Sequence, residues 1–156
     1  MSEQRLAFRI MIVDDNPDDL DLIGEAIKET GLPLELIAFT KGEAAFAYLC
    51  QGRPVDLVIS DLNMPRVSGI DLLTRIAAEP SLSHIPLALT SSSSQGRLPA
   101  HLTEQMQVPY LFKSAEWSGY LRLAREIYQT LSSRGQRTGR NADAQHLATL
   151  MRTPRI

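Results

Sequence analysis

Residues Val58 to Gly69 have the sequence VISDLNMPRVSG, an apolar run followed by an acid, a loop and a glycine. The apolar character begins at Val55, and the run is too short for a helix, so it predicts a buried strand over Val55–Ser60. Asp61 follows this strand directly, and Gly69 opens a helical pattern that continues to Ala78. Since ligands of α/β folds bind beyond the carboxyl ends of the strands, Asp61 is the first candidate for a functional side chain.

The rest of the chain repeats this alternation of short apolar runs and helical patterns. Four more strands are predicted, at Phe8–Val13, Leu34–Phe39, Pro86–Ser91 and Pro109–Phe112. Four more helices are predicted, at Pro17–Thr30, Gly42–Cys50, about Leu98–Gln107 and Glu116–Leu131. Nearly continuous apolar strands that alternate with helices indicate an α/β fold, a doubly wound five-stranded parallel sheet with five helices on its two faces.

The composition indicates an ordinary globular domain. Of the 156 residues, 44% are hydrophobic and 22% are charged, and the net charge of −2 gives no general attraction to nucleic acid or to anionic membranes. No apolar stretch approaches the roughly 20 residues that span a bilayer, and the amino terminus lacks the pattern of a signal peptide, so we expect a cytoplasmic protein. Cys50 lies in a helical pattern, which favours a buried thiol.

A polar segment after Leu131 marks the expected end of the domain. We therefore divide the chain into a domain at 1–131 and a polar tail at 132–156, in which Asn141 could cap a short helix over 141–151. The tail is too short for a DNA-binding domain with its own core, so we expect no nucleic-acid partner.

Acids, hydroxyls and a lysine stand at the ends of four predicted strands. They are Asp14 and Asp15, Asp61, Thr90 and Ser91, and Lys113. Each residue taken alone could have a purely structural role, since acids favour helix starts and turns and a lysine is commonly a surface charge. Together they indicate one site, and because three adjacent carboxylates repel one another unless a cation joins them, the site predicts Mg²⁺.

The segment from Val58 to Gly69 resembles the phosphoacceptor strand and loop of response regulator receiver domains, the signalling partners of histidine kinases. The resemblance extends over roughly Arg9 to Leu131 and implies a flavodoxin-like strand order 2-1-3-4-5. It also agrees in spacing, because the family's switch hydroxyl and lysine, 30 and 52 positions after the acceptor Asp61, correspond to Ser91 and Lys113.

The resemblance implies a role for each matching position. Asp61 would be the phosphoacceptor, and Lys113 would neutralise the phosphoryl group. Ser91 would be the switch hydroxyl, with the adjacent Thr90 as the alternative, and Tyr110 would be the aromatic switch residue. The Mg²⁺ ligands would be the carboxylates of Asp14, Asp15 and Asp61 and the backbone carbonyl of Asn63. The implied function is Mg²⁺-dependent phosphoryl uptake from a sensor histidine kinase followed by slow autodephosphorylation, in a signalling protein rather than an enzyme.

Two departures from the common pattern are similar to the stand-alone phytochrome-associated response regulators. Ser114 follows Lys113 where most receivers have proline, and the acidic pair is followed by an Asn-Pro-x-Asp motif at Asn16 to Asp19. This similarity implies a bacteriophytochrome as the kinase. The alternative is that Asn16 and Pro17 serve only as the cap and first residue of a helix.

Three other functions remain open alternatives. An aspartate-nucleophile phosphatase would have a second aspartate two positions after its nucleophile, where this chain has Asn63. A flavodoxin-like flavin carrier would have a loop rich in Ser, Thr and Gly after the first strand, where this chain is acidic. A pseudo-receiver would bind partners without phosphorylation, but it would not need the complete set of acids, hydroxyl and lysine.

The last predicted helix has a wide apolar face. Its apolar residues cover roughly 160° of the circumference, more than a single core-facing stripe requires. We therefore predict a homodimer through this helix, unless the tail folds over the surplus. The spacing of a helix-helix seam is met by Trp117, Leu121, Ala124, Tyr128 and Leu131.

Overall fold

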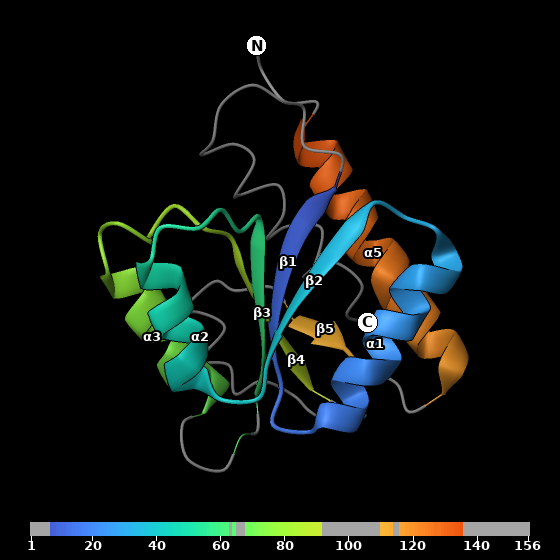
Figure 1. Ribbon diagram of the computed structural model, residues 1–156, viewed down its shortest axis with the longest axis horizontal. Coiled ribbons are helices and arrows are strands. Elements are labelled where there is room, and N and C mark those ends of the chain that lie inside the picture. The colour runs from blue at the N-terminus through green and yellow to red at the C-terminus, as the bar shows by residue number, and fades with distance from the viewer. Residues whose placement is uncertain (1–6, 63, 65–67, 92–109, 114–115, 136–156) are drawn as a thin grey trace.

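The computed structural model describes residues 7–62, 64, 68–91, 110–113 and 116–135, and it contains one parallel sheet of five strands in the order β2-β1-β3-β4-β5 (Figure 1). This confirms the predicted sheet and its strand order. The strands are β1 Phe8–Val13, β2 Leu34–Phe39, β3 Leu57–Asp61, β4 Leu87–Ser91 and β5 Tyr110–Phe112.

Helices cover both faces of the sheet. Those that the structure describes are α1 Pro17–Thr30, α2 Gly42–Cys50, α3 Gly69–Ala78 and α5 Trp117–Gly135. Figure 1 shows α1 and α5 side by side on one face and α2 and α3 on the other. The predicted bounds of α1, α2 and α3 are confirmed, whereas the helix expected at about Leu98–Gln107 lies outside the described residues.

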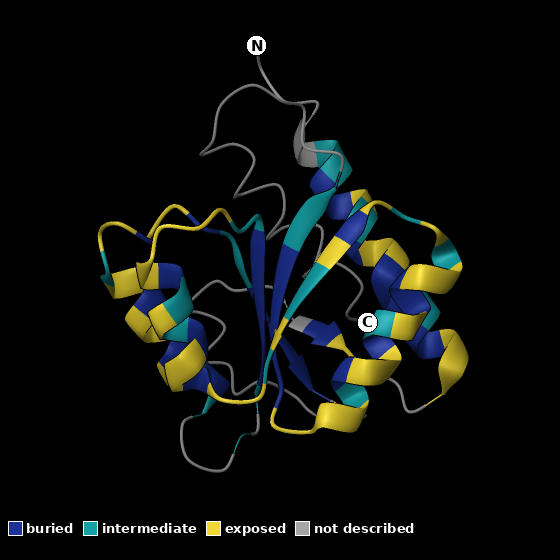
Figure 2. Cartoon of the chain, in the orientation of Figure 1, coloured by how far each residue is buried: buried dark blue, intermediate teal, exposed yellow. Residues whose placement is uncertain are grey.

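The alternation of side chains along the strands divides the core into two layers. In β1, Ile10 and Ile12 pack towards α1 and α5, while Met11 and Val13 pack towards α2 and α3. The central strands β1, β3 and β4 are almost entirely buried (Figure 2). Because both faces are covered, the free edge at the carboxyl ends of the strands is where polar residues can gather.

The predicted bounds of four elements differ from the structure: β4 begins at Leu87 rather than Pro86, β5 is Tyr110–Phe112 rather than Pro109–Phe112, and β3 and α5 differ at both ends. β3 begins at Leu57, which pairs with Ile10 of β1, and it extends to Asp61, which pairs with Thr90 of β4. The run from Val55 predicted apolar character correctly, but the start and end of a strand depend on its neighbours. α5 continues to Gly135, one turn beyond the expected domain end at Leu131, because polar residues can prolong a helix that is already anchored. The possible helix over 141–151 lies outside the described residues.

The prediction that Cys50 is buried is wrong. Cys50 is the last residue of α2 and its side chain is exposed. The buried residues of this helix are Gly42, Ala45 and Leu49, and the step of 100° from Leu49 turns Cys50 towards solvent.

The dimer seam predicted on the last helix is also wrong in part. Ala124 and Leu131 are only 1% and 2% exposed, because α5 packs against both the sheet and α1. Leu121 and Tyr128 are half-buried against the same core, and Tyr128 makes an edge contact with Phe8. The neighbouring helix α1 therefore covers much of the surplus apolar arc.

In the described part of the chain, no helix is both long and apolar enough to span a bilayer.

Candidate phosphoacceptor site

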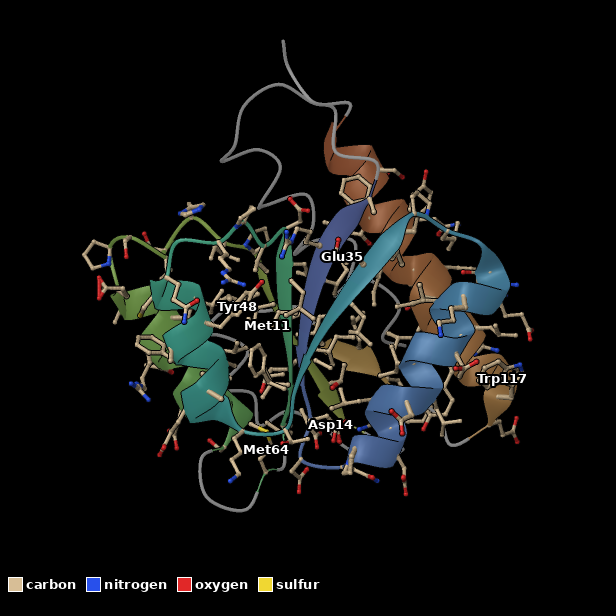
Figure 3. The ribbon with its side chains drawn as sticks, in the orientation of Figure 1. Met11, Asp14, Glu35, Tyr48, Met64 and Trp117 are labelled. Atoms are coloured by element: carbon tan, nitrogen blue, oxygen red, sulfur yellow. The ribbon has the colours of Figure 1, made fainter. Side chains whose placement is uncertain are left out.

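Three carboxylates meet at the carboxyl edge of the sheet. Asp14 and Asp15 follow β1, Asp61 ends β3, and one oxygen from each lies within 4.8 Å of the other two. The neighbouring register explains this meeting, since Val13 of β1 pairs with Ser60 of β3. Figure 3 shows Asp14 at this end of the sheet, near Met64 of the loop after β3.

This cluster suits a hard divalent cation. Asp14 and Asp61 are buried and Asp15 is exposed, so a cation held between them would keep one side open to water and to an incoming group. Oxygen ligands from few carboxylates, completed by water and phosphate, are what Mg²⁺ takes in proteins. The three carboxylates that were predicted as metal ligands are thus brought together, while Asn63 lies outside the described residues.

The buried carboxylate of Asp14 is held from two directions. The backbone N–H of Asn16 donates to Asp14 Oδ1 at 2.9 Å, and the Lys113 ammonium donates to Asp14 Oδ2. A buried charge is tolerated when it is paired and hydrogen-bonded, so these contacts allow an acid to lie 1% exposed at the end of β1.

Lys113 comes directly after β5 and is almost completely buried. Its Nζ contacts Asp14 and lies 2.8 Å from Asp19 Oδ2. Burial by itself would lower the pKa of Lys113, but the hydrogen bonds to Asp14 and Asp19 and the nearby charge of Asp61 raise this pKa above its ordinary value. The site therefore contains a fixed ammonium beside its carboxylates.

Asp19 and Tyr120 belong to the same hydrogen-bonded group, and the sequence reasoning assigned neither of them a role there. The Tyr120 hydroxyl donates to Asp19 Oδ1 at 2.8 Å. Burial would raise the pKa of Asp19, but the hydrogen bonds from Lys113 and Tyr120 outweigh it and hold this pKa below its ordinary value. Burial and the bond to Asp19 raise the pKa of Tyr120 to about 12.

A signal for Asp19 was present in the sequence. Asp19, Ile23 and Ala26 are spaced by four and three residues, which puts the acid on the core-facing stripe of α1. An acid on such a stripe needs a partner, and here the partner is Lys113. The sequence reasoning had treated Asp19 only as part of a family motif.

The hydroxyls of Thr90 and Ser91 are both buried, but the two residues lie on opposite faces of the sheet. Thr90 pairs with Asp61 and alternates with Ala88, which packs towards α1 and α5. Ser91 alternates with Leu89, which packs towards α2 and α3. Tyr110 pairs with Leu89 in the register of β4 and β5, and only its backbone is described. Ser91 and Tyr110 therefore occupy positions on one face, opposite to that of Lys113.

Gly69 holds the first turn of α3 against the end of β3. A Cβ added at Gly69 would overlap the carbonyl oxygen of Asp61 and lie 2.9 Å from its carbonyl carbon. The Gly69 N–H donates to the carbonyl of Leu62 at 3.2 Å, and the Leu62 N–H donates to that of Thr90 at 2.7 Å. The backbone around Asp61 is thus positioned by a contact that only glycine permits.

Comparison with known proteins agrees with this geometry. The response regulator receiver domain family matches residues 10–118 of the chain. Response regulator Rcp1 of Synechocystis sp. (strain ATCC 27184 / PCC 6803 / Kazusa) is 32% identical over 123 residues, with 69% of this chain and 83% of that protein covered. A Mn²⁺-bound structure of Rcp1 has a TM-score of 0.64 to this chain at 28% identity, covering 77% of this chain and 91% of that one.

Two phytochrome-associated regulators have the same fold. The phosphorylated cyanobacterial phytochrome response regulator RcpA has a TM-score of 0.70 at 30% identity, with 81% of this chain and 95% of that chain covered. The bacteriophytochrome response regulator AtBRR has a TM-score of 0.63 at 26% identity, with 79% and 93% covered.

Some relatives are much longer than this chain. It spans 23% of a probable cyclic di-GMP phosphodiesterase of Vibrio cholerae, to which it is 31% identical over 104 residues. The likeness to that protein concerns one segment of it and not its whole activity. The match over most of this chain, together with the acids and the lysine at the sheet edge, shows that the chain belongs to the response regulator receiver family, whose function is to accept a phosphoryl group on an aspartate.

Proposed function

We propose that Asp61 is the residue that accepts the phosphoryl group, and that the donor is a phosphohistidine of a sensor histidine kinase. The observation that supports this most directly is the position of Asp61. It ends β3 within the carboxylate cluster, beside Asp14 at the end of the neighbouring strand β1, and its charge interacts with the ammonium of Lys113, which follows β5.

The transfer requires little covalent chemistry from the protein. A carboxylate oxygen of Asp61 forms a new bond to phosphorus while the phosphorus–nitrogen bond of the phosphohistidine breaks, and the imidazole leaves with the electron pair. Positioning and charge neutralisation dominate such a transfer. Lys113 supplies a fixed positive charge beside Asp61, and its raised pKa keeps it protonated.

The metal of the proposal is Mg²⁺. The residues that would hold it are Asp14, Asp15 and Asp61 through their carboxylates and Asn63 through its backbone carbonyl. When bound, the ion supplies positive charge to the phosphoryl oxygens. The Mn²⁺-bound structure of Rcp1 supports a divalent ion in a relative.

The switch of the proposal is formed by Ser91 and Tyr110. An acyl phosphate on Asp61 adds nearly two negative charges and new acceptor oxygens, to which the Ser91 hydroxyl donates. The shared sheet face of Ser91 and Tyr110 supports this pair over Thr90. Water later hydrolyses the acyl phosphate, which resets a signalling protein that has no separate substrate.

A bacteriophytochrome is the proposed kinase, acting in the cytoplasm. The support comes from the similarity to RcpA, a phytochrome response regulator, and to AtBRR, a bacteriophytochrome response regulator, and from the Asn16 to Asp19 motif. The motif also has a structural role, since Asn16 accepts the Asp18 N–H at 3.0 Å and caps α1.

A homodimer through α5 remains part of the proposal in a narrower form. Trp117 is 38% exposed, and Leu121 and Tyr128 are half-buried. These three residues lie within about 40° of one another around the helix, so they form one flank of α5. We propose that the two copies of the chain contact each other through this flank. Ala124 and Leu131 are not part of the proposed contact, because they are already buried within one copy.

The decisive test is phosphoryl uptake by the purified protein. We expect the intact mass to increase by one phosphoryl group in the presence of Mg²⁺ and acetyl phosphate, and we expect Asp61→Asn to remove the increase because an amide is a far weaker nucleophile than a carboxylate. Asp71→Asn, an exposed position in α3, is the matched control and should take up phosphate normally. Labelling of Asp61→Asn at the wild-type rate would overturn the assignment.

A further inference from the structure

Three elements meet in one hydrogen-bonded chain beside the site. Lys113 follows β5, Asp19 lies in the first turn of α1, and Tyr120 lies in the first turns of α5. Asp19 uses one carboxylate oxygen for each partner, with Oδ2 at 2.8 Å from Lys113 Nζ and Oδ1 at 2.8 Å from the Tyr120 hydroxyl. Figure 1 shows α1 and α5 packed against one another on one face of the sheet, which is the packing that brings these residues together.

The two carboxylates that bind Lys113 are not equivalent. Asp14 belongs to the cluster that suits a divalent cation, whereas Asp19 does not. A cation in that cluster would compete with Lys113 for Asp14, but it would not compete for Asp19. Asp19 is therefore the partner that can keep the ammonium in place in both the metal-free and the metal-bound protein.

Such a partner matters because a lysine side chain is long and flexible. Fixing it costs substantial rotamer entropy, so an ammonium without a permanent acceptor spends time away from the position where it can neutralise charge. Tyr120 is 5% exposed and belongs to the core that α1 and α5 share, so its hydroxyl is held in place. The bond from Tyr120 in turn sets the orientation of the Asp19 carboxylate.

We propose that Asp19 is a positioning residue for Lys113 and that the Tyr120 hydroxyl holds Asp19 in the orientation this requires. The proposal rests on the proposed role of Lys113 in phosphoryl uptake at Asp61. It connects the phosphoacceptor site to α5 through Lys113, Asp19 and Tyr120, on the sheet face opposite to that of Ser91.

The kinetic experiment compares four variants at saturating Mg²⁺ with acetyl phosphate as donor. Asp19→Asn should lower the rate of uptake about tenfold, since a misplacement of roughly 1 Å can cost up to about 100-fold. Tyr120→Phe keeps the ring and should lower the rate less. The double variant should match Asp19→Asn, because Tyr120 acts through Asp19. Asp18→Asn is the control, with the same charge change at an exposed neighbour.

A second measurement observes the ammonium directly, in the absence of metal and donor. The chain has only three lysines, Lys28, Lys41 and Lys113, and the first two are exposed, so the Nζ resonance of Lys113 can be identified by ¹⁵N NMR. A buried ammonium that donates two hydrogen bonds exchanges its protons slowly with water. It should therefore give a detectable signal in wild type and in Asp18→Asn. The signal should be lost or broadened in Asp19→Asn.

The outcomes separate this inference from the function on which it rests. If Asp19→Asn took up phosphate as fast as Asp18→Asn and kept the Lys113 signal, the positioning role would be overturned while Asp61 remained the acceptor. Additive effects of Asp19→Asn and Tyr120→Phe would overturn the part assigned to Tyr120. If wild type took up no phosphate, the proposed function would fail. The NMR signal would still test whether Asp19 holds the ammonium of Lys113 in place. Circular dichroism establishes that each variant is folded. If Asp19→Asn unfolds, Tyr120→Phe still tests the hydrogen bonds that join Lys113, Asp19 and Tyr120.

Discussion

At the scale of single residues, the two adjacent hydroxyls at the end of β4 show how a step of one position changes the environment of a side chain. Ser91 lies on the sheet face towards α2 and α3, and Thr90 lies on the face towards α1 and α5. Spacing along the chain favoured Ser91 as the switch, and the register with Tyr110 gives an independent reason for the same choice.

We predict that Ser91→Ala takes up phosphate on Asp61 but fails to transmit the change to β5. The reason is that the hydroxyl on the face of Tyr110 is lost while the acids and Lys113 remain. The measurement is the shift of the Tyr110 amide in NMR spectra after addition of Mg²⁺ and beryllofluoride, a phosphoryl mimic. Thr90→Ala is the matched control and should keep the shift. The reverse pattern would make Thr90 the switch.

Tyr120 gives a second prediction at this scale. Its pKa is raised from 10.0 to about 12 by burial and by the bond to Asp19, so the folded protein keeps the phenol neutral where the unfolded chain ionises it. The unfolded state then binds fewer protons than the folded one, and the free energy of unfolding should fall as the pH rises from about 10 to about 12.

The titration of Tyr120 can be followed by ¹³C NMR of the ring carbon that bears the hydroxyl. We expect a midpoint near pH 12 in wild type and a lower one in Asp19→Asn, where the negative charge that opposes ionisation is absent. Burial persists in that variant, so its midpoint should remain above the ordinary value. An unchanged midpoint would mean that Asp19 does not act on Tyr120.

At the scale of helices and strands, the contact between β3 and α3 determines where the Asp61 backbone lies. Gly69 touches the Asp61 carbonyl, and its position in the first turn of α3 leaves no room for a Cβ. Gly24 differs, because a Cβ there would meet only the Leu36 side chain at 3.7 Å, an ordinary contact.

We therefore predict opposite effects of the same substitution at the two glycines. Gly69→Ala should lower the free energy of unfolding by about 1–3 kcal/mol through overpacking, and it should slow phosphoryl uptake because β3 is displaced. Gly24→Ala, inside α1, should raise the free energy of unfolding by about 0.5–1 kcal/mol and leave uptake unchanged. Urea denaturation measures both changes, and a neutral Gly69→Ala would show that α3 can move without cost.

At the scale of the whole molecule, the arrangement of α1 beside α5 decides how much apolar surface remains for another copy of the chain. The buried side of α5 includes Ala124 and Leu131, and the flank formed by Trp117, Leu121 and Tyr128 is left partly open. Trp117 also donates weakly to Glu29 of α1, with Nε1 and Oε2 at 3.4 Å.

We predict a homodimer that Leu121→Arg converts to a monomer, because a charge on this flank cannot be buried without a partner. Gln129→Arg introduces the same side chain on the exposed side of α5 and should leave the dimer intact. Sedimentation velocity at micromolar concentration, with and without beryllofluoride, measures the outcome. A wild-type monomer under both conditions would rule the dimer out.

The local sequence was sufficient for the order of the described strands and helices and for bringing most of the candidate site residues to one edge of the sheet. Apolar runs, the Asn16 cap with Pro17, and the glycines determined the bounds of α1, α2 and α3, because helices and strands follow from periodicity and capping within a few residues. The parallel order of the strands then brings their carboxyl ends to one edge. This is why Asp14, Asp15, Asp61 and Lys113 could be assigned to one site before their contacts were known.

The tertiary structure decided which side chains bind one another and which faces are covered. Asp19 and Lys113 are 94 residues apart in the sequence. They meet because the packing of α1 against α5 brings the first turn of α1 to the end of β5. The same packing buries Ala124 and Leu131, and the pairing of β4 with β5 places Tyr110 on the sheet face of Ser91 rather than on that of Thr90. A local pattern states that a residue needs a partner or a cover, but the identity of that partner depends on the packing of distant elements.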